Sequence, residues 1–305
     1  MKNLKVSKIK IAFIINPISG NRSKENLGTL IKENLDSEKF EHRILFTQKA
    51  GHGYQLALQM VEESIPLVIA VGGDGTVNEI ARALVHTNST LGIIPMGSGN
   101  GLARHLDIPL NPKDAIHMLN TYKCAEIDYG KANEILFFCT CGVGFDAHIG
   151  HEFSKSKTRG FGGYLKTILR EFISYRPKKY KLKTKTSSIK KKAFLVSFAN
   201  AAQYGNNAFI APNADIQDGY IDVSLLEPFP AFSLPSLGIR LFGKQFDKSR
   251  FVDVMKAKKV VLKRRRSGEF HFDGEPSYLG KRIKVRVIHK GLKVAVPWNS
   301  KLKTL

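Results

Sequence analysis

The chain has 305 residues, 43% of them hydrophobic and 24% charged, which is the composition of a folded globular protein and excludes a wholly disordered chain. Its length suggests about two domains, and no stretch reaches the roughly 18 apolar residues that a membrane-spanning helix needs. Lys and Arg number 48 against 26 Asp and Glu, so the formal charge of +22 favours a polyanionic partner: nucleic acid, an anionic membrane face or a phosphorylated substrate.

Strands and helices alternate along the first hundred residues. Short β-branched apolar runs predict the strands, and apolar residues three and four apart predict the helices between them. The predicted strands are Lys10–Asn16, Phe40–Thr47, Leu67–Val71 and Leu91–Pro95, and the predicted helices are Ser23–Leu35, Gly53–Ser64 and Val77–Val85. This alternation is typical of a parallel sheet covered on both faces, so we expect an α/β domain over residues 1–128.

The pattern changes after about residue 125, where most apolar runs are short and separated by polar turns. Only Gly163–Tyr175 and Pro235–Leu241 have helical spacing. The predicted strands are Ile135–Cys141, Ala193–Ala199, Ile221–Leu226, Lys259–Lys263, Glu269–Phe272 and Ile283–His289. We therefore predict a mainly antiparallel β-sandwich domain over residues 129–291, following the α/β domain.

Three loops rich in glycine, serine and asparagine each follow a predicted strand and precede a predicted helix. They are Asn16–Gly20, Gly72–Asn78 and Met96–Asn100. The carboxyl ends of parallel strands share one edge of the sheet, where α/β folds bind ligands and helix N-termini offer free N–H groups to phosphates. The loops match neither the P-loop nor the G-x-G-x-x-G pattern. Because the carboxylate of Asp74 would repel a phosphate, its presence indicates an intervening cation.

The strings VGGDGTVNEI and IPMGSGNGLARHL resemble the fingerprints of the diacylglycerol kinase catalytic domain, which sphingosine kinases and bacterial lipid kinases share. The resemblance continues in the same order through Gly142–Ala147, Asn200–Gly205, Pro212–Tyr220 and Phe272–Glu275. It therefore covers most of the chain and implies an ATP- and Mg²⁺-dependent lipid kinase whose acceptor is diacylglycerol. The resemblance also implies that residues 292–305 pack back on the first domain.

The resemblance implies a role for each matching residue. Those that bind the nucleotide are Asn16, Pro17, Ile18, Ser19, Gly20, Thr47, Gly72, Gly73, Asp74, Gly75, Thr76, Val77, Asn78 and Ser98. The family's structural magnesium site falls on Asp215, Asp218 and Tyr220. Its catalytic base is Asp273, with Glu275 nearby, and Asp146 faces the substrate headgroup. We expect Asp74 to hold Mg²⁺ beside the phosphates, helped by Arg22 or Arg104.

Alternative functions stay open at this point. Ser98 and Gly101 are closer to the sphingosine kinase variant of the second loop, which favours a sphingoid base or ceramide as acceptor. NAD kinases share the GGDGT loop, but GSGNGLA argues against that reading. A nucleic-acid-binding protein is the alternative of another class. Its basic tracts would be Arg176–Lys192 and Lys256–Arg266, which lack the interleaved aromatic residues of a stacking platform.

The two basic tracts lie outside the glycine-loop half of the chain. We therefore expect the charge to recruit an anionic membrane surface, at about 1 kcal/mol per basic residue, and expect no nucleic-acid partner. The segment Phe229–Phe242 is interpreted as a buried helix in preference to a membrane contact. The chain has three cysteines, Cys124, Cys139 and Cys141, which are expected to be reduced in a cytoplasmic protein. We expect this protein to associate peripherally with the membrane, and a homodimer is compatible with these features.

Overall fold

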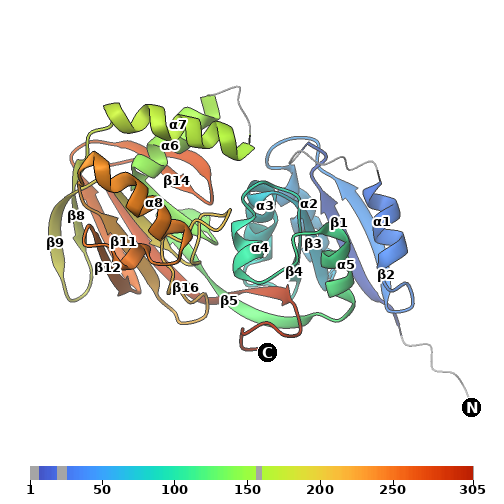
Figure 1. Cartoon of the computed structure of the whole chain (residues 1–305). Helices are drawn as coiled ribbons and strands as arrows, with labels where there is room; N and C mark the ends of the chain where they lie inside the picture. Colours follow the sequence, from blue (N-terminus) through green and yellow to red (C-terminus); the bar gives the residue numbers. More distant parts are fainter. Residues whose placement is uncertain (1–6, 19–25, 156–159, 305) are drawn as a thin grey trace, which may run out of the picture. The chain divides into compact units, whose positions relative to one another are not determined.

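The computed structural model describes residues 7–18, 26–155 and 160–304, with the backbone alone for 160–166 (Figure 1). The chain divides into two compact units: unit 1 comprises residues 1–127 and 291–305, and unit 2 comprises residues 128–290. Two strands, β5 (Lys123–Ala132) and β16 (Arg282–Val296), carry residues of both units. In the described part of the chain, no helix is long and apolar enough to cross a membrane.

Unit 1 is built on a parallel sheet with the strand order β2-β1-β3-β4. Its strands are β1 (Ile9–Ile15), β2 (Phe40–Phe46), β3 (Leu67–Gly72) and β4 (Thr90–Pro95). Its helices are α1 (Leu27–Asn34), α2 (His52–Glu62), α3 (Asp74–Leu84), α4 (Gly101–His105) and α5 (Pro112–Asn120). Every residue of Ile11–Ile15 and Leu67–Val71 is at most 1% exposed, as expected for central strands covered on both faces. Near the end of the chain, Val294 pairs in parallel with Leu91.

Unit 2 is a sandwich of two antiparallel sheets around one apolar core. The first sheet has the order β16-β13-β8-β9, and the second has the order β12-β11-β10-β7-β14-β15. The strands are β7 (Thr140–Gly144), β8 (Lys178–Lys183), β9 (Ser188–Ala193), β10 (Leu195–Ala199), β11 (Ile221–Leu226), β12 (Val252–Ala257), β13 (Lys259–Arg264), β14 (Gly268–Phe272) and β15 (Glu275–Leu279). Leu262 and Ile283 of the first sheet and Phe198 and Phe270 of the second are fully buried in the core between them.

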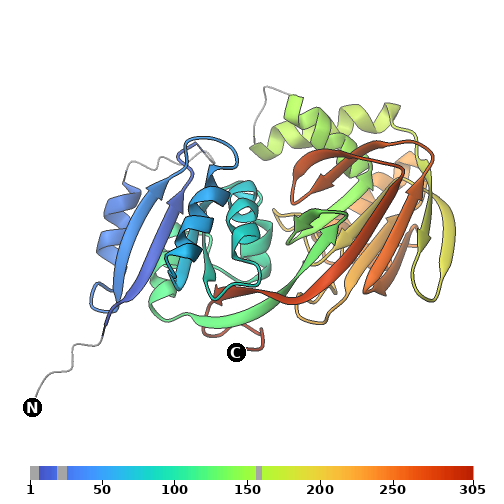
Figure 2. The same ribbon diagram turned by 180° about the vertical axis from the view of Figure 1, so that it is seen from behind.

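Three helices cover the other face of the second sheet: α6 (Phe145–Lys155), α7 (Gly160–Ser174) and α8 (Leu234–Phe242) (Figure 1). A second apolar cluster, which includes the buried Phe145, Phe194 and Leu237, joins these helices to the sheet. Figure 2 shows the first sheet from the opposite side. The interpretation of Phe229–Phe242 as a buried helix is correct for only one face of α8, because Ile239 is 75% exposed.

The predicted fold class, a parallel α/β part followed by an antiparallel sandwich, is confirmed. The prediction of one strand over Ile135–Cys141 is wrong, because the chain forms β6 (Ile135–Phe137) and then β7. Between them, the amides of Phe138 and Cys139 donate to the carboxylate of Asp273 instead of to a neighbouring strand. Helices α5 and α6 were not predicted, and neither were β5, β8, β9, β12 and β15. The predicted helix Ser23–Leu35 is α1, and its residues 23–25 lie outside the described ranges.

The basic tracts lie mainly on three neighbouring strands, β13, β8 and β9. Alternate residues of these strands and of the adjacent β16 lie on the outer side of the first sheet. We refer to this surface as the cationic face; its residues are Lys179, Lys181, Lys183, Lys190, Lys192, Lys259, Lys263, Arg282, Lys284 and Arg286. Many of them stand directly opposite one another: Lys181 pairs with both Lys190 and Lys263. Within the described residues, no carboxylate forms an ion pair with any member of the cationic face. Opposed like charges destabilise a sheet, so this face lowers the stability of unit 2.

Candidate functional site

The turn between β3 and α3 contains Gly72 and Gly73, which begin the predicted loop Gly72–Asn78. A Cβ on Gly72 would lie 2.5 Å from Oγ1 of Thr76, so the turn is too tight for any larger residue. Thr76 is buried, and its hydroxyl oxygen accepts a hydrogen bond of 3.1 Å from Nδ2 of Asn16, which follows β1. The loops after β1 and β3 are therefore joined by a direct hydrogen bond.

The loop after β4 packs against the same turn, backbone to backbone. A Cβ on Gly97 would lie 2.6 Å from the Cα of Gly73. The N–H of Met96 donates to the carbonyl oxygen of Gly72 at 2.8 Å, which fixes the two loops in register. Asn100 adopts a left-handed backbone conformation and its side chain bonds both the N–H and the carbonyl oxygen of Gly97. Three predicted loops thus form one continuous structure at the carboxyl edge of the sheet.

Asp74 connects these loops through its carboxylate. The N–H groups of Asn100 and Gly101 donate to its two oxygens at 2.9 and 2.7 Å. These amides stand at the N-terminus of α4, where helices leave N–H groups unpaired and favour negative charge. The structure therefore gives Asp74 a role that the sequence did not predict: it fastens the second glycine loop to the first.

The other predicted nucleotide-binding residues lie in different environments. Pro17 and Ser98 are exposed in the loops, and Ile18 is 87% exposed. Val77 and Asn78 are buried in α3, and Thr47 is buried with its N–H donating to the carbonyl oxygen of Ile15. Residues Ser19, Gly20 and Arg22 lie outside the described ranges. The side chain of Arg104 donates to the carbonyl oxygen of Gly99 at 3.0 Å, so it braces the second loop.

In unit 2, Asp273 and Gly274 form the two-residue turn between β14 and β15. Both have positive φ angles, 45° and 86°, as a type I′ hairpin turn requires. The carboxylate of Asp273 accepts N–H bonds of 2.8, 2.8 and 3.1 Å from Phe138, Cys139 and Thr140. These donors fix the orientation of a carboxylate that is only 9% exposed, whereas Glu275 is exposed on the next strand.

Asp146 forms a second buried acidic centre, which includes two residues that sequence reasoning did not select. Its Oδ2 receives a hydrogen bond of 2.9 Å from the hydroxyl of Tyr204 and lies 3.0 Å from Nε2 of His271. His271 lies two residues before Asp273 on β14. Burial, followed by the charges of Asp273 and Asp146, raises the pKa of the Cys141 thiol well above its usual value. Cys141 is therefore an inert thiol between the two carboxylates.

The predicted magnesium ligands lie together in the turn before β11. Oδ1 of Asp218 accepts the N–H of Tyr220 at 2.9 Å, and its Oδ2 is 2.7 Å from Nζ of Lys256. Oδ2 of the neighbouring Asp222 receives no hydrogen bond, and burial raises the pKa of that carboxyl group. Nζ of Lys256 lies 3.5 Å from Oδ2 of Asp222, so two carboxylates share this ammonium group. The charge of Asp215 also acts on Asp222, so a cation fits the charge and the hard oxygen donors of the turn. Among the described residues, no three acidic, His or Cys side chains form a ready-made metal cluster.

Asp128 is a buried acid that no sequence motif marks. It is fully buried, and its oxygens accept N–H bonds of 2.7 Å from both Gly219 and Lys290. Nδ1 of the half-exposed His289 lies 2.8 Å from Oδ1. Asp128 thereby links β5, the turn that carries the predicted magnesium ligands, and β16 inside unit 2. This role could not be predicted, because Asp128 belongs to no motif and lies in a segment interpreted from sequence as a linker.

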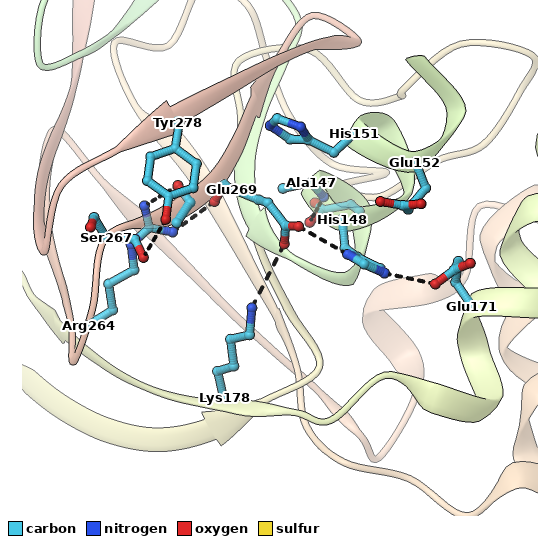
Figure 3. A network of polar contacts seen from close by, with 12 residues as sticks. Ala147, His148, His151, Glu152, Glu171, Lys178, Arg264, Ser267, Glu269 and Tyr278 are labelled. Carbon is cyan, nitrogen blue, oxygen red and sulfur yellow. Dashed lines mark hydrogen bonds and ion pairs between the residues drawn. The ribbon is translucent and has the colours of Figure 1, made fainter. Parts of the chain in front are cut away.

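Figure 3 shows a third polar network, which joins α6 and α7 to β14. His148 lies between two carboxylates: Nδ1 is 3.1 Å from Glu269 and Nε2 is 3.0 Å from Glu171. Lys178 lies 3.8 Å from the other oxygen of Glu269. The hydrogen bond from His148, and then that from Arg170, lowers the pKa of Glu171. This network stabilises the packing of α6 against α7 and against β14.

Two family descriptions match nearly the whole chain. Residues 10–132 match the diacylglycerol kinase catalytic domain, and residues 139–295 match the YegS C-terminal NAD kinase beta sandwich-like domain. A probable lipid kinase YegS-like from Chromohalobacter salexigens is 28% identical over 238 residues, or 76% of each chain. A diacylglycerol kinase from Mycobacterium tuberculosis is 27% identical over 226 residues, which cover 72% of this chain and 73% of the relative.

Solved structures share the fold. That of a diacylglycerol kinase from Bacillus anthracis superposes with a TM-score of 0.76 at 21% identity and covers 97% of this chain and 99% of its own. An NAD kinase from Archaeoglobus fulgidus, in complex with ATP, gives a TM-score of 0.53 at 12% identity over 94% of each chain. At these identities the similarity establishes the fold and leaves the substrate to the chemistry of the site.

Proposed function

Because this chain belongs to the family of diacylglycerol kinase catalytic domains followed by a YegS-type C-terminal domain, we propose that it is a lipid kinase that transfers the γ-phosphate of ATP to the hydroxyl group of diacylglycerol. The observation that carries the proposal is the contact between Gly73 and Gly97, which merges two glycine loops into one surface. Loops without side chains at the contact let backbone amides approach a polyphosphate closely. A phosphate-binding surface of this kind is what a kinase of this family requires.

Phosphoryl transfer needs alignment of the two substrates and neutralisation of charge more than covalent chemistry by the protein. In this proposal the first amides of α3 and the loop of Asn16 hold the nucleotide phosphates, and Asp74 keeps the loops in place. Mg²⁺ bound with the nucleotide supplies the neutralising charge when present. A structural ion would be held by Asp215, Asp218 and the carbonyl oxygen of Tyr220.

The acceptor side of the proposal rests on Asp273. Three amide donors hold its carboxylate in one orientation, so that it can take the proton of the acceptor hydroxyl group without rearranging. Glu275, exposed on the next strand, is the nearest acid in sequence. Asp146, through its bonds to Tyr204 and His271, would shape the surface that receives the lipid headgroup.

The acceptor lipid has a second candidate. Ser98 is exposed in the second loop, and Gly101 donates its N–H to Asp74. Both residues occur in the sphingosine kinase variant of that loop, so a sphingoid base or ceramide is the alternative acceptor. Whichever lipid is used, we propose a cytoplasmic enzyme that meets its substrate at an anionic membrane surface, as its charge of +22 favours.

Labelled ATP and a panel of micellar lipids test the assignment. We expect phosphate transfer to diacylglycerol and loss of transfer in Asp273→Asn, with Asp107→Asn as the matched control at an exposed aspartate outside the proposed site. Because Asn at position 273 would bring an amide group close to three amide donors, its folding is checked by thermal unfolding and its nucleotide binding by a fluorescent ATP analogue. Transfer to none of the lipids, or full transfer by a folded Asp273→Asn variant, would refute the proposal.

A further inference from the structure

Helix α8 has two apolar faces, only one of which is buried. Leu237 packs into the cluster that joins the helices of unit 2 to the second sheet. On another side, Phe232, Ile239 and Phe242 are 80%, 75% and 48% exposed. They are spaced by seven and three residues, so they form a stripe along the helix and the turn before it. Large apolar side chains gathered in this way on a surface mark an interaction site.

A cavity of about 320 Å³ lies beside this stripe. Its polar lining consists of three basic side chains and three serines: Arg240, Lys248, Arg250, Ser233, Ser236 and Ser249. No acidic residue lines it, and in the described part of the chain no carboxylate forms an ion pair with the three cations. Asp247, the adjacent acid in sequence, accepts instead a hydrogen bond of 2.7 Å from Asn213.

These lining groups suit a phosphate ester. Arginine presents a planar fork of donors that matches phosphate oxygens, and lysine and serine add further donors. A cavity of this size holds one headgroup, and the apolar stripe beside it offers a surface to acyl chains. We propose that α8 and this cavity form a docking site for an anionic phospholipid bilayer, with a headgroup phosphate in the cavity and Phe232, Ile239 and Phe242 among the acyl chains.

Two observations favour a bilayer at α8 over other arrangements. Nucleic acid would need a basic groove that follows its backbone, whereas the cations here enclose a single cavity. The cationic face carries more charge, but it has no aromatic side chain and only one apolar residue, Val261, in its paired rows, so it can attract a bilayer without entering it. The inference rests on the proposed function to the extent that a membrane lipid is the acceptor.

Sedimentation with vesicles of phosphatidylglycerol and phosphatidylcholine tests this site in the full chain. We expect the triple variant Arg240→Gln, Lys248→Gln, Arg250→Gln to lose roughly tenfold or more in partitioning. The variant Phe232→Ser, Ile239→Ser should lose binding as well while keeping its charge. The matched control removes three charges from the cationic face: Lys181→Gln, Lys190→Gln, Lys263→Gln.

The control decides between the two basic surfaces. If its loss equals or exceeds that of the α8 variants, the cationic face is the membrane contact and the proposal is wrong. If an oligonucleotide competes for wild-type protein better than the vesicles do, the partner is nucleic acid and the proposal is also wrong. All variants are compared by thermal unfolding, so that only folded protein is scored.

A fluorescence reporter gives a second readout. The only tryptophan, Trp298, is 75% exposed and belongs to unit 1. In the variant Trp298→Phe, Ile239→Trp, we expect the emission to shift to the blue on anionic vesicles, and the variant Trp298→Phe, which has no tryptophan, gives the background emission. Absence of a shift in the variant would contradict insertion of α8.

The two proposals fail separately. If wild type transfers phosphate to micellar diacylglycerol and the α8 variants bind vesicles as well as wild type does, the kinase assignment is kept and the docking site is rejected. If the α8 variants lose vesicle binding and wild type transfers phosphate to no lipid, the docking site is kept and the kinase assignment is rejected.

Discussion

Gly97 lies so close to Gly73 that a Cβ on Gly97 would stand 2.6 Å from the Cα of its partner. Gly97→Ala must therefore push the two glycine loops apart. We expect a loss of about 1–3 kcal/mol of stability and loss of nucleotide binding. Thermal unfolding and titration with a fluorescent ATP analogue measure both. Gly150→Ala is the matched control, since nothing lies within 4 Å of its Cβ and alanine favours the helix α6.

Asp74→Asn tests the connection between the loops. The variant loses the charge that the N–H groups of Asn100 and Gly101 share, so we expect about 1–3 kcal/mol of destabilisation and weaker ATP binding. Denaturant unfolding and ATP titration give the two quantities. The same substitution at the exposed Asp107 should change neither. If Asp74→Asn binds ATP normally, the carboxylate does not hold the loops as described.

Asp128→Ala should be among the most destabilising single changes in unit 2. It leaves the buried N–H group of Gly219 without an acceptor, at about 1–3 kcal/mol, and the part-buried N–H group of Lys290 as well, at a smaller cost. His289→Ala removes only a half-exposed partner and should lower the free energy of unfolding by less than about 1 kcal/mol. Equal effects of the two changes in denaturant unfolding would show that the contact with His289, and not the amides, stabilises the turn.

Acid should weaken the attachment of α7. The hydrogen bond from His148 lowers the pKa of Glu171 below its ordinary value of 4.5. A lowered acid pKa stabilises the folded state above the ordinary value, and this contribution disappears as the pH falls through the folded value. The Tm advantage of wild type over Glu171→Gln should therefore be present at pH 5.5 and shrink below pH 4.5. Glu62→Gln, an exposed control, should show no such pH dependence.

The parallel unit could be predicted from sequence because its central strands are continuous apolar runs and each is followed by a helical repeat. Strands β8 and β9 were not predicted because they are rich in lysine. In β8 the lysines alternate with Tyr180 and Leu182, but the composition of the segment is that of a charged tract. Helix α6 was hidden by Gly150 and its histidines, which interrupt the apolar repeat. Element type could be predicted where burial is continuous and not where one face is charged.

The glycine loops could also be predicted, since strand, loop and helix are adjacent in sequence. The contacts of the acids could not. Asp273 bonds amides about 135 residues away, and Asp128 bonds an amide 162 residues away. His271 and Tyr204 acquire their significance only through Asp146. Such pairs depend on sheet topology and carry no local signal.

The cationic face has a consequence for the behaviour of the protein in solution. Lys263 stands opposite both Lys181 and Arg282, and salt shortens the range of such repulsion from about 10 Å at 0.1 M to about 3 Å at 1 M. We therefore expect Tm to rise with sodium chloride, and to rise less in Lys181→Gln, Lys190→Gln, Lys263→Gln. Any multivalent anion should act in the same way. In a thermal-shift screen, polyphosphates and heparin would raise Tm without occupying a site, so only compounds that also stabilise the triple variant report on specific binding.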